Sequence, residues 1–227
     1  MAETELFDEW PQRYEEWFPT PMGGLVKQTE CGLILDMLQP EKGDKILDAG
    51  CGTGVFTLDY LAAGAEVVGL DISAPMLAWA VRKAARYPFT AVQADMTCLP
   101  FDDETFDKTV SVTALEFIQD GRKALDELFR VTKPGGCVVV GTLNSLSPWA
   151  ARRRAKTQVG QRHILEGAFF RSPEELLACS PIEGTVATVV HFQKDDPPET
   201  ALETERLGQV RGLDTGAFVA ARWVTPG

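Results

Sequence analysis

The sequence predicts an α/β fold, in which a mostly parallel β-sheet carries helices on both faces. Short apolar runs alternate with helix-like patterns, and this alternation is typical of such folds. The apolar run Lys45–Ala49 leads into three glycines at alternate positions, Gly50, Gly52 and Gly54. A second apolar run, Glu66–Asp71, ends in an acid. Because glycine has no Cβ, this turn can bring bare backbone against a ligand at the carboxyl ends of the strands.

The first half of the chain is expected to alternate helices and strands. Pro40 lies just beyond the first helix, and Gly64 lies where the second should end. Ser73 is a typical N-cap residue, and Pro75 is tolerated in the first turn of the helix that follows. The expected elements are a helix over Leu25–Leu38, a strand over Lys45–Ala49, a helix from about Val55 to Ala62, a strand over Glu66–Leu70, a helix after Ser73 and a strand over Thr90–Ala94.

The second half should complete the sheet. Asn144–Arg171 is the least regular part, and we expect a lid or helical insertion within residues 144–180. Gln193–Thr204 is acidic and contains prolines, which indicates a mobile connector. The other expected elements are a strand over Asp107–Val112, a helix capped by Asp120 and ended by Pro134-Gly135-Gly136, a strand over Cys137–Leu143, a short helix from Ser172-Pro173 to Ala178, and β-rich segments over Thr185–Phe192 and Gly216–Val224.

Length and charge favour a single soluble domain. The 227 residues suffice for one sizeable core, which we expect to span 1–227 with a helical cap over 1–40. No run approaches the ~18–20 apolar residues of a membrane span, and the acidic amino terminus does not resemble a signal peptide. The net charge of −11 argues against a nucleic-acid partner. The basic run Arg152–Arg154 could meet an anionic substrate or form a solvated helix face.

The cysteine pattern indicates no metal or redox site. The five cysteines are widely spaced and include no C-x-x-C motif, so no zinc ligand set is expected. An odd count in a chain without a signal peptide favours reduced thiols and a cytoplasmic location.

The glycine spacing distinguishes between two kinds of nucleotide site. A dinucleotide-binding turn reads G-x-G-x-x-G, whereas this chain reads G-x-G-x-G and has Val55 in the place of the last glycine. A phosphate-binding P-loop would need Gly-Lys-Ser/Thr, which does not follow the glycines here. Asp71 can accept hydrogen bonds from two ribose hydroxyls, because an ionised carboxylate offers two acceptor oxygens. The pattern therefore indicates a nucleoside site.

At these motifs the sequence resembles the class I S-adenosylmethionine-dependent methyltransferases, and within them the UbiE-like or type 11 subgroup. The matching landmarks occur in the order of that family across roughly residues 40–145. They are the glycine turn Asp48–Gly54, the acid Asp71, the segment Gln93-Ala94-Asp95-Met96, the strand Phe106–Val112 and the turn Lys133–Gly136.

The resemblance implies a Rossmann-like, seven-stranded sheet whose last strand is antiparallel, with S-adenosylmethionine as cofactor and S-adenosylhomocysteine as product. Asp48 would face the ammonium group of the cofactor, Asp71 would take the ribose hydroxyls, and Ile72 would pack on adenine. Asp95 and Met96 would bind the adenine ring. The remaining candidates for cofactor binding are Gly50, Cys51, Gly52, Gly54, Met76, Ser111 and Thr113.

The acceptor side carries weaker patterns. The sulfonium of the cofactor is already an activated leaving group, so a general base is needed only if the acceptor must lose a proton. Candidate catalytic residues are His163, Tyr14 and Glu116. Related sequences often read Leu-Glu-His where this chain reads Leu115-Glu116-Phe117, which indicates an apolar wall. The candidate acceptor pocket is aromatic and comprises Tyr14, Trp17, Phe18, Phe117 and Trp149.

Other functions remain open from the sequence. The first expectation is methyl transfer to a small-molecule acceptor by a monomer or homodimer. A non-catalytic protein that binds S-adenosylmethionine is one alternative, and an NAD(P)-dependent oxidoreductase is a weaker one, because the glycine spacing differs. A metalloid methyltransferase would need clustered thiolates, which the scattered cysteines do not indicate.

Overall fold

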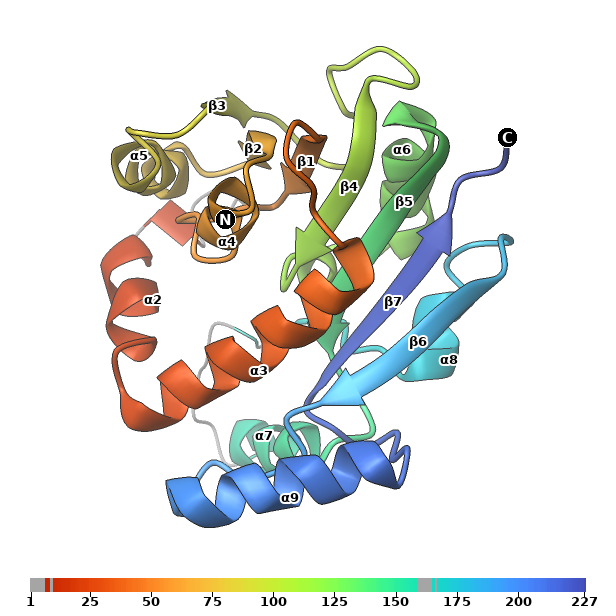
Figure 1. Ribbon diagram of the computed structural model, residues 1–227. Helices are drawn as coiled ribbons and strands as arrows, with labels where there is room; N and C mark the ends of the chain where they lie inside the picture. Colours follow the sequence, from red (N-terminus) through yellow and green to blue (C-terminus); the bar gives the residue numbers. More distant parts are fainter. Residues whose placement is uncertain (1–6, 9, 159–164, 166) are drawn as a thin grey trace.

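The structure, a computed structural model, describes residues 7–8, 10–158, 165 and 167–227. Within these residues seven strands form one sheet (Figure 1). Their order is β3 (Phe89–Gln93), β2 (Glu66–Asp71), β1 (Lys45–Ala49), β4 (Phe106–Val112), β5 (Thr132–Leu143), β7 (Phe218–Val224) and β6 (Gly184–Val189). The first five strands in chain order pair in parallel, and β7 is antiparallel to both β5 and β6. The predicted mostly parallel sheet with an antiparallel last strand is confirmed.

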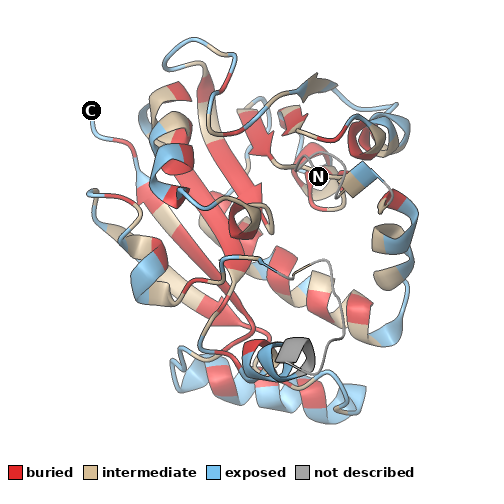
Figure 2. Ribbon diagram, turned by 180° about the vertical axis from the view of Figure 1, so that it is seen from behind, coloured by how far each residue is buried: buried red, intermediate tan, exposed pale blue. Residues whose placement is uncertain are grey.

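Helices cover both faces of the sheet, and one apolar cluster lies between the sheet and the helices on each face. One cluster lies beneath α3 (Pro21–Leu38) and α4 (Thr57–Ala62), and the other beneath α6 (Gly121–Val131) and α8 (Pro173–Leu177). The central strands are buried almost throughout, as Figure 2 shows. The other helices are α2 (Pro11–Trp17), α5 (Ala74–Lys83), the 3-10 turn η1 (Leu115–Phe117), α7 (Pro148–Gln158) and α9 (Pro198–Val210).

Most of the predicted helix caps are present. The Ser73 hydroxyl accepts from the Met76 amide at 3.4 Å at the start of α5, and the Asp120 carboxylate accepts from the Lys123 amide at 3.2 Å at the start of α6. Each cap satisfies a backbone N–H that has no partner inside the helix. α3 begins four residues before its predicted start, because Thr20 caps it by accepting from the Gly23 amide at 3.0 Å.

The predicted boundary between α6 and β5 is also wrong. The helix capped by Asp120 ends at Val131, and Pro134–Gly136 lie inside β5. The strand begins early because Thr132 already pairs with Phe106 of β4.

The predicted connector at Gln193–Thr204 is wrong as well, because most of it belongs to α9. Its prolines lie at the helix start, where a missing N–H has no cost. Ala201 and Glu205 of α9 are buried, and the Glu205 carboxylate accepts from the His191 amide at 2.6 Å. The acidic composition therefore reflects the exposed side of a docked helix. β6 and β7 are adjacent and antiparallel as expected, with α9 in the connection between them.

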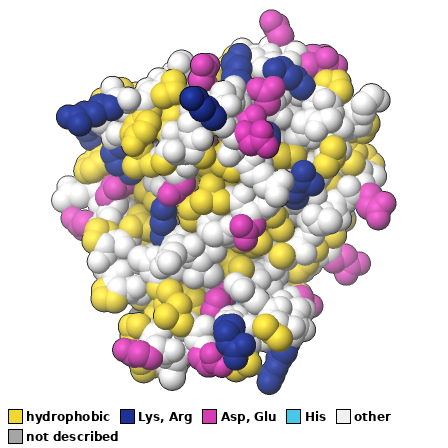
Figure 3. Space-filling view, in the orientation of Figure 1, with side chains coloured by type: hydrophobic (Ala, Val, Ile, Leu, Met, Phe, Trp, Pro, Cys, Tyr) yellow, Lys and Arg dark blue, Asp and Glu magenta, His cyan; other side chains and the backbone are white. Residues whose placement is uncertain are grey.

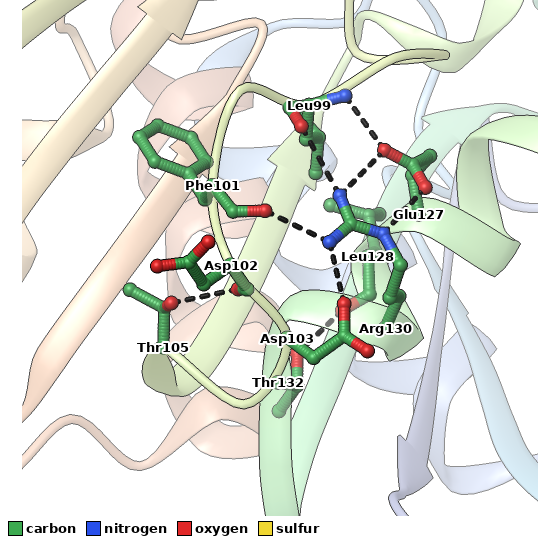
Figure 4. Close-up of polar contacts among 9 residues, drawn as sticks. All are labelled: Leu99, Phe101, Asp102, Asp103, Thr105, Glu127, Leu128, Arg130 and Thr132. Atoms are coloured by element: carbon green, nitrogen blue, oxygen red, sulfur yellow. Dashed lines mark hydrogen bonds and ion pairs between the residues drawn. The ribbon is translucent and has the colours of Figure 1, made fainter.

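The loop between β3 and β4 carries Asp95 and is tied to α6 (Figure 4). The Arg130 guanidinium donates to the Phe101 carbonyl at 2.8 Å and to the Leu99 carbonyl at 3.1 Å. The Glu127 carboxylate accepts from the Leu99 amide at 2.7 Å. These contacts hold the middle of the loop against α6.

The described helices include none that is both long and apolar enough to span a membrane. On the face seen in Figure 3, lysine and arginine side chains lie scattered among acidic and hydrophobic ones.

Candidate functional site

A cavity of about 720 Å³ lies at the carboxyl ends of β1, β2 and β4. Strand ends form one wall, with Asp48, Asp71 and Val112 among its residues. Side chains of α2 and α3 form another wall. Figure 1 shows α2 at the left edge of the molecule and α3 running from there across the front of the sheet. The carboxyl ends of parallel strands are the usual place for ligands in open α/β sheets.

The glycine turn follows β1 and brings backbone to the cavity wall. Gly50, Gly52 and Gly54 all have positive φ angles, of 78°, 54° and 77°. A Cβ on Gly50 would lie 2.3 Å from the Cβ of Ala114, so both the conformation and the space require glycine there. Gly50 and Gly52 line the cavity, as does Cys51 between them. Gly54 is not among the lining residues and instead packs close to Ala80 of α5.

Asp71 ends β2 and lines the cavity beside the glycine turn. One carboxylate oxygen accepts from the Gly52 amide at 2.8 Å, and the other accepts from the Ser73 amide at 2.9 Å. An ionised carboxylate has about four lone-pair positions, so acceptor capacity remains for a ligand. Burial raises the pKa of Asp71, although the backbone N–H groups of Ser73 and Gly52 oppose that shift. Asp71 therefore both fixes the turn and can accept hydrogen bonds in the cavity.

Asp48 lies at the base of the cavity and is 2% exposed. Its carboxylate accepts from the Thr57 hydroxyl at 2.6 Å. Burial raises the pKa of Asp48 to about 7, and the charge of Asp71 adds to this shift. A cationic group entering the cavity would favour the ionised form of Asp48.

The predicted adenine-side residues Ile72, Asp95 and Met96 line the cavity, and so does Met76, another predicted cofactor-binding residue. The Asp95 carboxylate accepts from the Thr97 amide at 2.8 Å, which holds the start of the loop after β3.

Ser111 and Thr113 differ in their placement. Ser111 is fully buried in β4 and is not a lining residue; its hydroxyl has no hydrogen-bond partner among the described residues. Thr113 lines the cavity with a positive φ of 51°, and its amide donates to the Gly141 carbonyl at 2.9 Å. Tyr14 of α2 lies near Thr113. Burial is the main cause that raises the pKa of the Tyr14 hydroxyl, and the Thr113 side chain opposes this shift.

All five predicted aromatic residues of the acceptor pocket line the cavity: Tyr14, Trp17, Phe18, Phe117 and Trp149. They come from α2, η1 and α7, so segments far apart in the sequence meet here. The Trp149 indole N–H donates to the Phe192 carbonyl at 2.7 Å, which fixes that ring. Sequence reasoning missed five further aromatic lining residues: Phe7, Trp10, Phe56, Phe169 and Phe170. His163 lies outside the described residues.

Glu116 lies in η1, is 1% exposed and lines the cavity. Its carboxylate accepts from the Thr142 hydroxyl at 2.9 Å. Burial raises the pKa of Glu116 to about 7, while the guanidinium groups of Arg171 and Arg153 lower it.

Glu30 of α3 is a third buried carboxyl group in the cavity wall, after Asp48 and Glu116, and sequence reasoning missed it. It lies on the buried stripe of α3 at a spacing of four residues, between Val26 and Ile34. An acid inside an apolar helical stripe is the signal that could have found it. Burial raises the pKa of Glu30 to about 8, and the charge of Glu116 adds to the shift.

Four cationic side chains also line the cavity, and each contacts a protein group. Arg13, Arg153 and Lys194 lie over the rings of Trp10, Phe170 and Trp17, respectively, at 5.4 Å, 5.6 Å and 5.4 Å from the ring centroids. Arg152 forms an ion pair with Asp195. Among the described residues no group of three or more His, Cys, Asp or Glu side chains could hold a metal ion.

Comparison with known proteins assigns the family. Residues 47–140 match the profile of a family described as "Methyltransferase domain". A malonyl-[acyl-carrier protein] O-methyltransferase of Pseudescherichia vulneris is 32% identical over 203 residues, which cover 80% of each chain. A protein of the same name from Erwinia billingiae is 44% identical over 105 residues, 46% of this chain and only 41% of that relative. The chain belongs to the S-adenosylmethionine-dependent methyltransferase family.

The fold comparison agrees. A crystal structure titled as an S-adenosylmethionine-dependent methyltransferase and possible histamine N-methyltransferase, from Thermotoga maritima, superposes with a TM-score of 0.75. The superposition covers 98% of this chain and 99% of that one at 21% identity. At this identity the likeness shows the Rossmann-like methyltransferase fold alone.

Proposed function

We propose that this chain binds S-adenosylmethionine in the cavity and transfers its methyl group to a small-molecule acceptor. The observation that carries the proposal is that a polar surface and an aromatic surface line the same cavity. The Gly50–Gly52 backbone and the Asp71 carboxylate lie at one wall, and an aromatic wall from α2, η1 and α7 lies opposite.

The described residues fit this cofactor. Asp71 retains acceptor capacity for ribose hydroxyls, and Asp48 offers a buried carboxyl group suited to an ammonium ion. Ile72 and Met96 supply apolar surface for a flat base, with Asp95 beside them. When bound, S-adenosylmethionine supplies a methyl group on a positively charged sulfur.

The acceptor wall would then position a nucleophile and exclude water. The Tyr14 ring packs edge-on against Phe18, with ring centroids 5.0 Å apart, and the Trp149 ring is held by its hydrogen bond to the Phe192 carbonyl. Residues held by such contacts keep an acceptor in one orientation, which is the main requirement when the leaving group is already activated. Glu116 and Tyr14 are the proposed polar groups beside the acceptor. We further propose that residues 1–40 and 144–180 form the acceptor side of a single domain, because α2, α3 and α7 contribute to the cavity wall.

A calorimetric titration tests the cofactor assignment. The purified chain should bind S-adenosylmethionine and S-adenosylhomocysteine with micromolar dissociation constants and should not bind NADH. Binding of NADH alone would contradict the proposal and favour an oxidoreductase. Binding of the first two ligands without methylation of any acceptor in a broad small-molecule screen would favour a non-catalytic binding protein.

A further inference from the structure

Glu30 is a buried carboxyl group for which the described part of the chain supplies no hydrogen-bond or ion-pair partner. It is 7% exposed, and its side chain forms no hydrogen bond or ion pair with any described residue. The other cavity carboxyl groups differ in this respect, because Asp48, Asp71 and Glu116 accept hydrogen bonds from Thr57, Gly52 and Thr142. Burying a carboxylate without a partner costs free energy. The position of Glu30 on the apolar stripe of α3 therefore lowers the stability of the folded chain.

The charges around Glu30 make a cation its natural partner. Among the described residues, the charge that acts on it is that of Glu116, which is repulsive. Tyr14 of α2 lines the same cavity, and the charges of both acids add to the desolvation that raises the pKa of its hydroxyl. Two acids and a phenol therefore meet inside the cavity, and a positively charged group there would satisfy both carboxylates.

The rings around this space suit the same ligand. The same cavity that contains the two acids is also lined by aromatic rings, those of Tyr14, Trp17, Phe18 and Phe117. Their faces carry negative electrostatic potential and attract a cation within about 6 Å. One of these rings, Trp17, already has a cation over it, because Lys194 lies 5.4 Å from its centroid. Arg13 and Arg153 lie over two other rings of the cavity wall.

We propose that the acceptor is an amine carried on an aromatic or apolar body, that it enters as an ammonium ion, and that Glu30 binds this ammonium group. The inference rests on the proposed methyl-transfer function and names the chemical class of its acceptor. An anionic acceptor would instead have to approach Glu30, which forms no ion pair with any described residue.

The chemistry of amine methylation gives both acids a second use. An ammonium nitrogen must lose one N–H proton before its lone pair can form the new N–C bond. The Glu30 or Glu116 carboxylate takes this proton and later releases it to water. The S–C bonding pair stays on sulfur, which becomes a neutral thioether, and the product nitrogen carries the positive charge. Burial raises the pKa of Glu30 to about 8 and the pKa of Glu116 to about 7. A general base works best when its pKa lies near the operating pH, so both groups can accept and release this proton near neutral pH.

Three matched probes test the proposal on the wild-type chain saturated with S-adenosylhomocysteine. These are 2-phenylethylamine, 2-phenylethanol and 3-phenylpropionate, which share an aromatic body and differ in charge. Calorimetry should show the amine binding at least ten times more tightly than the alcohol, and the alcohol more tightly than the anion. Equal or tighter binding of the anion would overturn the proposal. So would the failure of all three to bind at millimolar concentration while S-adenosylhomocysteine still binds.

A variant assigns the selectivity to Glu30. Glu30→Gln keeps the shape and removes the charge, so it should weaken binding of 2-phenylethylamine at least tenfold. Its affinities for S-adenosylhomocysteine and for 2-phenylethanol should stay within twofold of the wild type. Asp36→Asn is the matched control, because Asp36 is an exposed acid on the same helix. Unchanged amine affinity in Glu30→Gln would contradict the role of Glu30.

The two proposals fail in distinguishable ways. If S-adenosylhomocysteine does not bind, the proposed function is wrong. If it binds and the amine is not preferred, only the acceptor class is wrong. Incubation with S-adenosylmethionine should add one methyl group to 2-phenylethylamine by mass spectrometry, and Glu30→Gln should slow this addition at least tenfold.

Discussion

The two walls of the cavity are built in different ways. The wall formed by strand ends uses backbone turns and short-range contacts, such as Asp71 bonded to Gly52 and Ser73. The opposite wall uses side chains from α2, α3, η1 and α7, which meet only in the folded chain. The first wall is therefore encoded by a short sequence motif, whereas the second depends on tertiary packing. This difference suggests that changes in the first wall affect every ligand, and changes in the second affect the acceptor alone.

The largest expected effect is at Asp71. Asp71→Ala removes the acceptor for the ribose hydroxyls and leaves the Gly52 amide without its partner. Affinity for S-adenosylhomocysteine should fall at least 100-fold, about 2.7 kcal/mol, as measured by calorimetry. Circular dichroism should show a folded protein, because the Asp71 side chain lies at the edge of the core. A folded variant with wild-type affinity would remove Asp71 from the proposed site.

A pair of glycine variants separates backbone conformation from close packing. Gly50 and Gly135 have nearly equal φ angles, 78° and 75°, but a Cβ would strike Ala114 only at Gly50. Gly50→Ala should lower the free energy of unfolding by about 2 kcal/mol more than Gly135→Ala does, because overpacking adds to the strain of a positive φ. Urea denaturation measures both. Equal losses would mean that the turn yields to admit the methyl group.

The pH dependence of stability tests the acceptor wall without any ligand. The pKa of Glu30 is raised from 4.5 to about 8 in the folded chain, so the folded state binds the proton more tightly than the unfolded state. Wild-type stability therefore contains a term that falls as pH rises from about 4.5 to about 8. Glu30→Gln lacks this term.

The unfolding free energy of Glu30→Gln relative to wild type should thus increase by about 1.4 kcal/mol for each pH unit within that window. Glu116 and Tyr14 face Glu30 and are unchanged in this variant. A difference that stays constant with pH would show that Glu30 is already ionised at pH 5, and would contradict its burial without a partner.

The smallest effect is expected at Cys51. Burial, followed by the charges of Asp48 and Asp71, raises the pKa of this thiol, so little thiolate forms. Iodoacetamide at pH 8 should label the exposed Cys98 before Cys51, as followed by peptide mass spectrometry. Cys51→Ala should bind S-adenosylhomocysteine within about threefold of wild type. Rapid labelling of Cys51 would mean that the cavity exposes a reactive thiol.

The contrast between the walls also explains what the sequence could predict. The strands flanking the glycine turn were predicted to within about one residue, because apolar runs and capping residues are local features. The wrong predictions concern segments whose secondary structure depends on tertiary contacts. The acidic, proline-containing segment after His191 forms α9, because Ala201 and Glu205 dock on the core.

Glu30 illustrates the same limit within the site. Its helix was predicted, yet its role depends on Glu116 and Tyr14, which reach it from elements distant in the chain. Ser111 illustrates the converse, because its motif matched while the structure buries it away from the cavity. A strand motif predicts which residues lie near the site, but the alternation of side chains along β4 decides which of them face it.

The structure of the chain with S-adenosylhomocysteine bound would test the central claim most directly. We expect the ribose hydroxyls within hydrogen-bond distance of Asp71, adenine beside Ile72 and Met96, and the sulfur facing the space between Glu30 and Glu116. A ribose that does not contact Asp71, or a sulfur turned away from the acceptor wall, would contradict the account.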